Sequence, residues 1–178
     1  MMVRRVVTGH DGAGKSVFVS DEDVPPLTAA LLAGGAFYRL WGADEAPTFP
    51  DDGAPAPHDA YFPPVGGYRF AMFMLAAGSR ETPPDLDLQA AKHEMDQKLP
   101  GLTELMDPDE PGMHATDTVD LGIVVSGELA LELDNAARTV LRAGDTFVQN
   151  GTRHRWLNAA TEPVLVALFS TGSNRKER

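Results

Sequence analysis

Hydrophobic and polar residues alternate along much of the second half of the chain. Segments rich in β-branched residues are separated by turn signals such as Ser126-Gly127 and Asn150-Gly151. A period of two is that of a half-buried strand, so the pattern predicts short antiparallel strands. The predicted strands are Phe70–Ala76, Val119–Val125, Leu129–Leu133, Thr139–Leu141, Thr146–Gln149, His154–Asn158 and Val164–Phe169. From residue 112 onward we interpret them as an all-β antiparallel meander.

One segment between these strands has the period of a helix. Thr82 and Asp85 have the spacing of a capping box, and Pro83 and Pro84 suit the first turn. Pro100-Gly101 predicts the end of the helix. The apolar residues that fall on one helical face are Leu88, Ala91, Met95 and Leu99.

The first sixty residues have a weaker pattern. Arg4–Thr8 and Ser16–Ser20 predict a hairpin around a glycine-rich turn, and residues 43–64 have the composition of a loop. The segment Gly9–Ser16 also matches the pattern of a nucleotide-binding P-loop. Such a loop needs a helix directly after it. Because Val17–Pro26 combines β-branched residues, acids and two prolines, we interpret the match as accidental.

Composition narrows the range of functions. The chain has 178 residues, enough for one domain with a sizeable core. It has no cysteine, which excludes a disulfide framework and a thiol nucleophile. Its net charge of -11 disfavours nucleic-acid partners, because phosphate backbones carry the same sign. No uncharged run is long enough to cross a bilayer and no signal peptide is visible, so we expect a cytoplasmic protein without a membrane partner.

Polar residues occupy one face of the segment that leads into the strand at Val119–Val125. If this segment is extended, alternation places four polar side chains on that face. They are His114, Thr116, Thr118 and Asp120. His154 and Asn158 share a face of another strand by the same parity. A polar face within a β-core either faces water or lines a cavity, and two imidazoles with a carboxylate predict a divalent metal site.

These residues resemble the two motifs of the cupin superfamily. His114 stands at the first histidine position of the first motif, and Asp120 stands where the glutamate belongs. Thr116 occupies the place of the second histidine. Gly151–Asn158 matches the G-x2-H-x3-N end of the second motif, with His154 as its histidine. The resemblance is specific over residues 112–158, and it is closest to a subgroup of small bacterial cupins.

The resemblance implies an all-β fold, a cupin or jelly-roll β-barrel with an N-terminal extension and one helical insert. Residues 1–67 would form the extension, with strands and a Pro-rich loop. Residues 68–171 would form the barrel, with the insert at about 82–106, and residues 172–178 would form a tail.

The resemblance also implies a site and a chemistry. His114, Asp120 and His154 would hold a divalent ion, such as iron, zinc, manganese or nickel, and Thr116 and Gln149 would orient the substrate. The reaction would be oxidation or Lewis-acid chemistry on a small, largely apolar molecule inside the barrel, so the chain would be an oxidoreductase or a lyase. Two alternatives stay open: a metal-free module that binds or senses a small molecule, and a scaffold.

Small barrels of this kind often pair through their N-terminal strands. Val3–Val7 and Val17–Val19 offer β-segments for such pairing at the start of the chain. We therefore expect a homodimer.

Overall fold

The computed structural model describes residues 1–78 and 85–176. Within these residues the regular structure consists mainly of β-strands, with one α-helix and three short 3-10 turns. The helix is α1 (Leu88–Lys98), and the 3-10 turns are Ala30–Leu32, Thr103–Leu105 and Asp134–Ala136. The strands are β1 (Val3–His10), β2 (Ser16–Val24), β3 (Ala36–Ala43), β4 (Tyr68–Leu75), β5 (Thr118–Ser126), β6 (Glu128–Leu133), β7 (Arg138–Arg142), β8 (Thr146–Asn150), β9 (His154–Leu157) and β10 (Val164–Gly172). Every strand that the alternation predicted is therefore confirmed.

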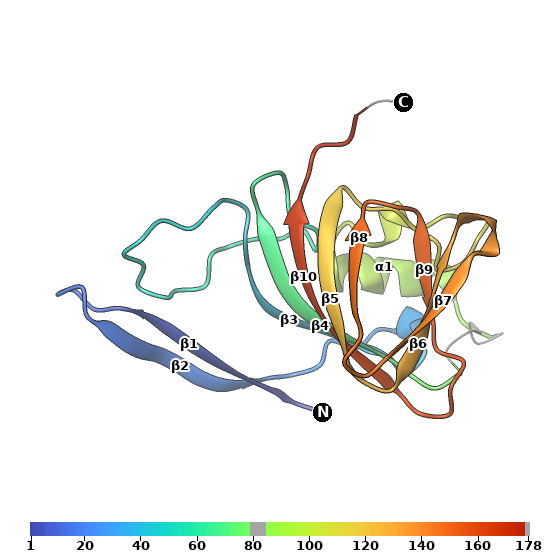
Figure 1. Ribbon diagram of the computed structural model, residues 1–178, viewed down its shortest axis with the longest axis horizontal. Helices are drawn as coiled ribbons and strands as arrows, with labels where there is room; N and C mark the ends of the chain where they lie inside the picture. The colour runs from blue at the N-terminus through green and yellow to red at the C-terminus, as the bar shows by residue number, and fades with distance from the viewer. Residues whose placement is uncertain (79–84, 177–178) are drawn as a thin grey trace.

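Two antiparallel sheets face each other and form a jelly-roll β-barrel (Figure 1), which confirms the predicted fold class. The larger sheet has the order β3-β4-β10-β5-β8, and the smaller has the order β7-β6-β9. The predicted meander is wrong, because β7, β8 and β9 follow one another in sequence but alternate between the sheets. This crossing lets both sheets bury their inner faces against each other.

The core lies between the inner faces of the two sheets. Phe73, Val124, Leu129, Phe147, Val164 and Val166 are buried there. The Phe147 ring contacts that of Trp156 at a tilt of 52°, with ring centroids 4.8 Å apart. A Cβ at Gly122 would lie 2.1 Å from the Phe147 ring, so glycine leaves the space that this ring occupies. Large side chains therefore fill this part of the barrel.

The larger sheet begins before the predicted start of the barrel at residue 68. β3 pairs with β4 along most of its length, with a bulge between Arg39 and Trp41. Pairing across the sheet thus includes a strand that lies within the predicted N-terminal extension. The division of the chain into an extension, a barrel and a tail stays a prediction.

Helix α1 packs against the end of the barrel near the 3-10 turn at Ala30–Leu32. Its N-cap is Asp87, whose carboxylate accepts hydrogen bonds from the amides of Gln89 and Ala90 at 3.0 Å. The predicted capping box at Thr82 lies outside the described residues. Of the predicted apolar face, Ala91, Met95 and Leu99 are buried, whereas Leu88 is exposed, because it lies in the first turn beyond the packed surface.

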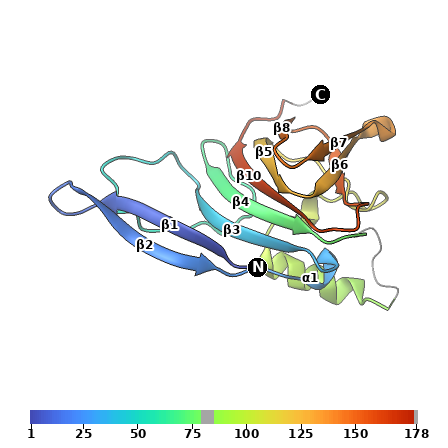
Figure 2. The same cartoon turned by 60° about the horizontal axis from the view of Figure 1, so that its bottom comes forward.

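Strands β1 and β2 form a separate two-stranded arm that extends from the barrel (Figure 2). They pair from Val3 with Val24 to His10 with Ser16, as the hairpin prediction requires. The segment that matches a P-loop is the turn of this hairpin, and a strand follows it in place of the helix that phosphate binding needs. The nucleotide-binding interpretation therefore has no structural support. No helix in the described part of the chain is long and apolar enough to span a membrane.

Candidate functional site

A row of polar side chains crosses the inner face of the larger sheet near one end of the barrel. Arg69 on β4 pairs with Ser170 on β10, Ser170 with Asp120 on β5, and Asp120 with Gln149 on β8. All four residues are buried, with exposed fractions between 2% and 6%. The next row inward contains Ala71, Leu168, Gly122 and Phe147. Buried polar groups require partners, so this row is the natural place for a functional site.

Two histidines lie together at the candidate site. The backbone of His114 bonds to that of His154 in both directions, with N···O distances of 2.9 and 2.8 Å. The centroids of their imidazole rings are 4.3 Å apart. His154 is 2% exposed, and its ring meets Trp156 edge-on at 5.4 Å. The structure thus brings together two of the three predicted metal ligands.

Backbone carbonyls set the tautomer of both imidazoles. Nδ1 of His114 lies 3.0 Å from the carbonyl oxygen of Gly112, and Nδ1 of His154 lies 2.9 Å from that of Thr152. A carbonyl oxygen only accepts, so each Nδ1 carries the proton and each Nε2 keeps its lone pair. Burial lowers the pKa of His114. Burial and the neighbouring His114 lower the pKa of His154 to about 4. Both rings are therefore neutral at pH 7, the form that binds metals or accepts a proton.

The carboxyl of Asp120 is the third predicted ligand. Burial raises its pKa, although hydrogen bonds from Ser170 and Thr118 and the charge of His114 oppose the rise. Its Oδ1 atom is buried and has no hydrogen-bond partner among the described residues. An unpartnered buried carboxylate oxygen carries a desolvation penalty. This oxygen is thus free to accept a proton, a ligand hydrogen bond or a cation.

Thr116 and Gln149 are the residues predicted to orient a substrate, and both are buried, Gln149 as a member of this row. The Thr116 hydroxyl bonds to that of Thr118 at 2.7 Å. The Gln149 amide donates to the carbonyl oxygen of Thr152 at 3.1 Å. Each side chain therefore has an internal partner, and Gln149 supports the residue that fixes the His154 ring. Their contact with a substrate stays a prediction.

The side chains of His114, His154 and Asp120 are suitable types of ligand for a divalent ion, but the three do not converge on one position. Two neutral imidazoles and a carboxylate with an unpartnered oxygen are suitable ligands for iron, zinc or manganese. However, no three His, Cys, Asp or Glu side chains within residues 1–78 and 85–176 lie close enough together to hold an ion. The histidine pair therefore fits two ligand positions, and Asp120 lies nearby without completing the set.

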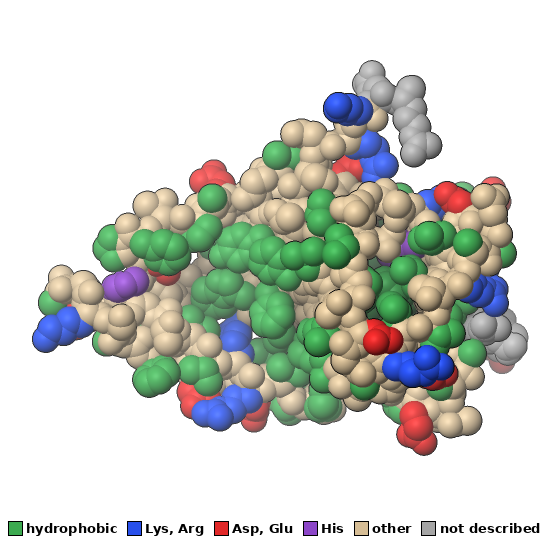
Figure 3. All heavy atoms as spheres, viewed as in Figure 1, with side chains coloured by type: hydrophobic (Ala, Val, Ile, Leu, Met, Phe, Trp, Pro, Cys, Tyr) green, Lys and Arg blue, Asp and Glu red, His purple; other side chains and the backbone are tan. Residues whose placement is uncertain are grey.

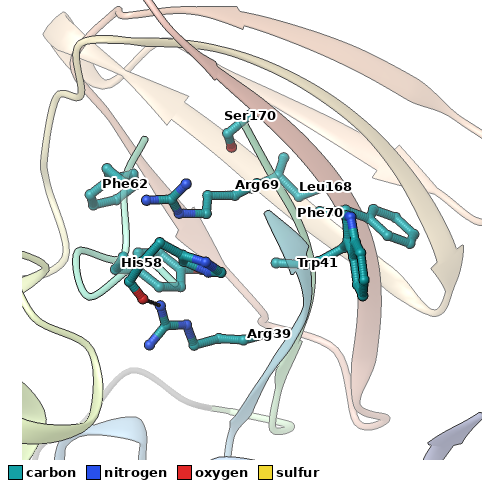
Figure 4. A pocket seen from close by; sticks show the side chains of 10 residues that line it. Arg39, Trp41, His58, Phe62, Arg69, Phe70, Leu168 and Ser170 are labelled. Carbon is teal, nitrogen blue, oxygen red and sulfur yellow. Dashed lines mark hydrogen bonds between the residues drawn. The ribbon is translucent and has the colours of Figure 1, made fainter. Parts of the chain in front are cut away.

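Several residues at this end of the barrel were not predicted from the sequence. A small pocket beside the polar row is lined by residues that include Arg39, His58, Tyr61, Arg69 and Ser170 (Figure 4). Arg69 and Ser170 each lie one residue outside a predicted strand, at Phe70 and Phe169, so strand parity could have placed them. Tyr61 and His58 lie in an irregular loop, where no local pattern indicates which side chains point inward.

The cupin domain family matches the chain over residues 102–170. The chain is also similar to the phomopsin biosynthesis cluster protein C' of Diaporthe leptostromiformis, with 26% identity over 86% of this chain and 69% of that protein. It is 35% identical to the cupin-domain-containing oxidoreductase srdD of Neurospora crassa, over 53% of this chain and 54% of that protein. The chain thus spans about two thirds of the first relative and about half of the second.

Among solved structures, the cupin domain of Cnp3 from Schizosaccharomyces pombe has a similar fold. The two superimpose with a TM-score of 0.50 over 96% of this chain and 88% of that chain, at 9% sequence identity. At this identity the likeness concerns the fold alone.

The relatives named here come from fungi, whereas the sequence motifs suggested a bacterial subgroup. Membership of that subgroup stays a prediction.

Proposed function

Residues 102–170 of this chain match the cupin domain family, and from that premise we propose that the chain is a metal-dependent enzyme acting on a small organic molecule. The observation that carries the proposal is the pair of neutral imidazoles at His114 and His154, whose Nε2 lone pairs are free. Relatives named as cupin-domain-containing oxidoreductases support oxidation as the reaction class. Lewis-acid chemistry at a carbonyl is the second reaction that the same donors would serve.

His114, His154 and Asp120 are the residues that would hold the ion. A bound divalent ion would supply Lewis acidity or, if it is iron, redox chemistry. The carbonyls of Gly112 and Thr152 fix the two rings by accepting from Nδ1, as outer-shell groups do in metal sites. The unpartnered Oδ1 of Asp120 is the third donor, and Asp120 is therefore the residue whose substitution tests the proposal most directly.

The other residues of the site bind, orient and exclude water. The neighbouring hydroxyl groups of Ser170 and Thr118 lower the pKa of the Asp120 carboxyl and so favour its charged form against the effect of burial. Phe147 and Trp156 close the barrel on the inward side of the polar row. Such apolar walls keep bulk water from the reacting groups and strengthen the interactions made there.

A metal-free module that binds or senses a small molecule is the second candidate. The observation that favours it is the absence of an assembled three-donor group among the described residues. Thr116, which replaces a histidine of the family motif, bonds to Thr118 instead. In this alternative the histidine pair and Asp120 would contact the ligand directly by hydrogen bonds.

Metal analysis of protein purified without chelators distinguishes these two candidates. The enzyme proposal expects about one iron, zinc, manganese or nickel ion per chain, and turnover that is lost with a chelator and restored by the metal. Absence of metal, before and after anaerobic reconstitution with each ion, would contradict it and favour the metal-free module.

We propose further that a second copy of this chain covers the outer side of the larger sheet. Exposed apolar side chains gather there in a contiguous band (Figure 3). We define this outer face by Phe70, Leu121, Ile123, Val148 and Phe169, which line a shallow hollow of about 360 Å³. Contiguous apolar patches of this kind are typical of interfaces rather than of monomer surfaces. The cytoplasmic location and the absence of nucleic-acid partners stay predictions.

A further inference from the structure

A second feature of the candidate site is a small pocket at the edge of the polar row. It lies between β3, β4, β10 and the loop that contains His58 and Tyr61, and two guanidinium groups, those of Arg39 and Arg69, line it (Figure 4). Its volume is about 10 Å³, which is room for one water-sized group. No carboxylate is among its lining residues. In a chain with a net charge of -11, such a cationic pocket is unusual.

The two arginines differ in how their charges are compensated. Arg69 forms an ion pair with Asp44 and donates to the carbonyl oxygens of Ala43, Ala60 and Tyr68. Its bonds thus satisfy a buried guanidinium and hold the surrounding loops. Arg69 is therefore a structural residue.

Arg39 forms no ion pair among the described residues. Its guanidinium donates only to the backbone carbonyls of His58 and Asp59, at 3.2 and 3.4 Å. Burial and the neighbouring Arg69 both lower the pKa of Arg39, and the weaker effects of Tyr61 and Asp59 only partly oppose them. A half-buried cation beside a second cation, held by two long bonds, lacks an anion.

The remaining walls of the pocket define what kind of anion would fit. Phe62 borders the pocket on the side of the loop, as Figure 4 shows, whereas Trp41 and Phe70 are cross-strand neighbours whose rings lie toward the outer face. Ser170 lines the pocket and is the cross-strand neighbour of Asp120, so the pocket adjoins the group proposed to hold the ion. A ligand seated here would thus place its charged end at Arg39 and an apolar or aromatic part against the Phe62 ring.

We propose that Arg39 binds the carboxylate of the substrate, which is therefore an organic acid with an aromatic or apolar body. This inference rests on the proposed function for the position of the reacting group, but the binding step needs no metal. The small volume fits one carboxylate oxygen, and the rest of the molecule would lie toward Phe62. A charge-assisted bond to a guanidinium explains why an arginine without a carboxylate partner lines this pocket.

Titration with benzoate and its neutral isostere benzamide tests the proposal. Tryptophan fluorescence and calorimetry follow binding to the full chain in the presence of a chelator, because Trp41 borders the pocket. Benzoate is expected to bind saturably below about 10 mM, and benzamide at least about tenfold more weakly. Equal binding of the two probes, or no saturation by benzoate in this range, would overturn the proposal.

Variants separate charge recognition from support of the loop. Arg39→Met should weaken benzoate binding at least about tenfold, whereas Arg39→Lys keeps the charge and should retain most of it. Arg4→Met, which removes an exposed arginine on the arm, is the matched control and should bind as the parent does. Unchanged benzoate binding by Arg39→Met contradicts the proposal. The proposal is also contradicted if Arg39→Lys and Arg39→Met lose benzoate binding equally and both have a lowered melting temperature. Benzoate binding is measured in the presence of a chelator, so it does not depend on a metal. A chain that binds benzoate but takes up no metal would refute only the proposed function.

Discussion

His114 and His154 exchange two backbone hydrogen bonds, and their imidazole rings lie 4.3 Å apart. The first residue precedes β5 and the second begins β9, so the contact joins the two sheets at one end of the barrel. Because both Nδ1 atoms are bonded to backbone carbonyls, each of the two neighbouring rings keeps its lone pair on Nε2. The predictions about metal binding and acid stability depend on this arrangement.

We predict that metal affinity depends on all three donors. His154→Ala and Asp120→Asn should each reduce divalent metal affinity by at least about 10- to 100-fold, the loss typical of disturbing a metal site. Thr116→His should strengthen binding, since it restores a donor at the position where the family motif has one. Isothermal titration with zinc and manganese measures each change.

His93→Ala is the matched control, because His93 is exposed on α1 and bonds only to Gln97. It should leave metal affinity unchanged. If Asp120→Asn binds metal as tightly as the parent while His154→Ala does not, Asp120 is not a ligand.

Acid should destabilise the metal-free protein through His154. The folded-state pKa of His154 is about 4, below the ordinary value of 6.5. As pH falls from 6.5 toward 4, the unfolded chain therefore gains a proton that the folded chain does not, and the free energy of unfolding falls. A shift of this size corresponds to about 3 kcal/mol over that range.

Urea unfolding of chelated protein at pH 7 and pH 4.5 measures this effect. The difference between the two pH values should be smaller in His154→Gln, and unchanged in His93→Gln. Burial raises the pKa of Asp120, which acts in the opposite direction, but this contribution cancels when the variant is compared with the parent. An equal pH dependence in His154→Gln and the parent would show that the ring is not held neutral.

A methyl group at residue 122 should destabilise the barrel. The Cβ would lie 2.1 Å from the Phe147 ring, so Gly122→Ala forces this ring or the backbone to move. We expect a loss of about 1–3 kcal/mol, the usual range for overpacking. In the double variant with Phe147→Leu the two losses should be less than additive, because the smaller side chain relieves the clash.

Thermal and urea unfolding test this expectation. Gly12→Ala is the control, since an added Cβ there meets nothing within 4 Å. If the losses of unfolding free energy in the double variant are additive, the Phe147 ring does not need the space that Gly122 leaves.

A charged residue on the outer face should dissociate the proposed dimer. Val148 is 60% exposed and borders the hollow, so Val148→Glu should convert a dimer of 19.1 kDa chains into a monomer with little change in thermal stability. Sedimentation velocity at micromolar concentration measures the outcome. Leu88→Glu, which alters an exposed apolar residue on α1, should remain dimeric.

The arm is tested separately, because the sequence suggested pairing through the N-terminal strands. Phe18 is 81% exposed near the end of the arm, and Phe18→Asp should weaken the dimer only if the arm contributes to the interface. A parent chain that sediments as a monomer would refute both the outer-face interface and the predicted homodimer.

Local alternation predicted the strands other than β3 (Ala36–Ala43), and it predicted the inward direction of several site residues. Thr116, Thr118 and Asp120 are buried together as their parity predicts, and Asp117 on the opposite face pairs with Arg175 at the surface. Side-chain direction in a strand repeats every two residues, so it is a property of the chain itself. Helix α1 was also predicted, and its N-cap is Asp87, whose side chain accepts hydrogen bonds from the first amides of the helix.

The sequence by itself therefore determined the strands other than β3, and which faces carry His114, Asp120 and His154. Only the tertiary structure decided that β8 and β9 belong to different sheets, that Arg69 and Ser170 continue the row of Asp120, and that the loop with Tyr61 adjoins it. The physical reason is distance along the chain. Strand direction follows from neighbouring residues, whereas pairing and register depend on how distant strands close a common core.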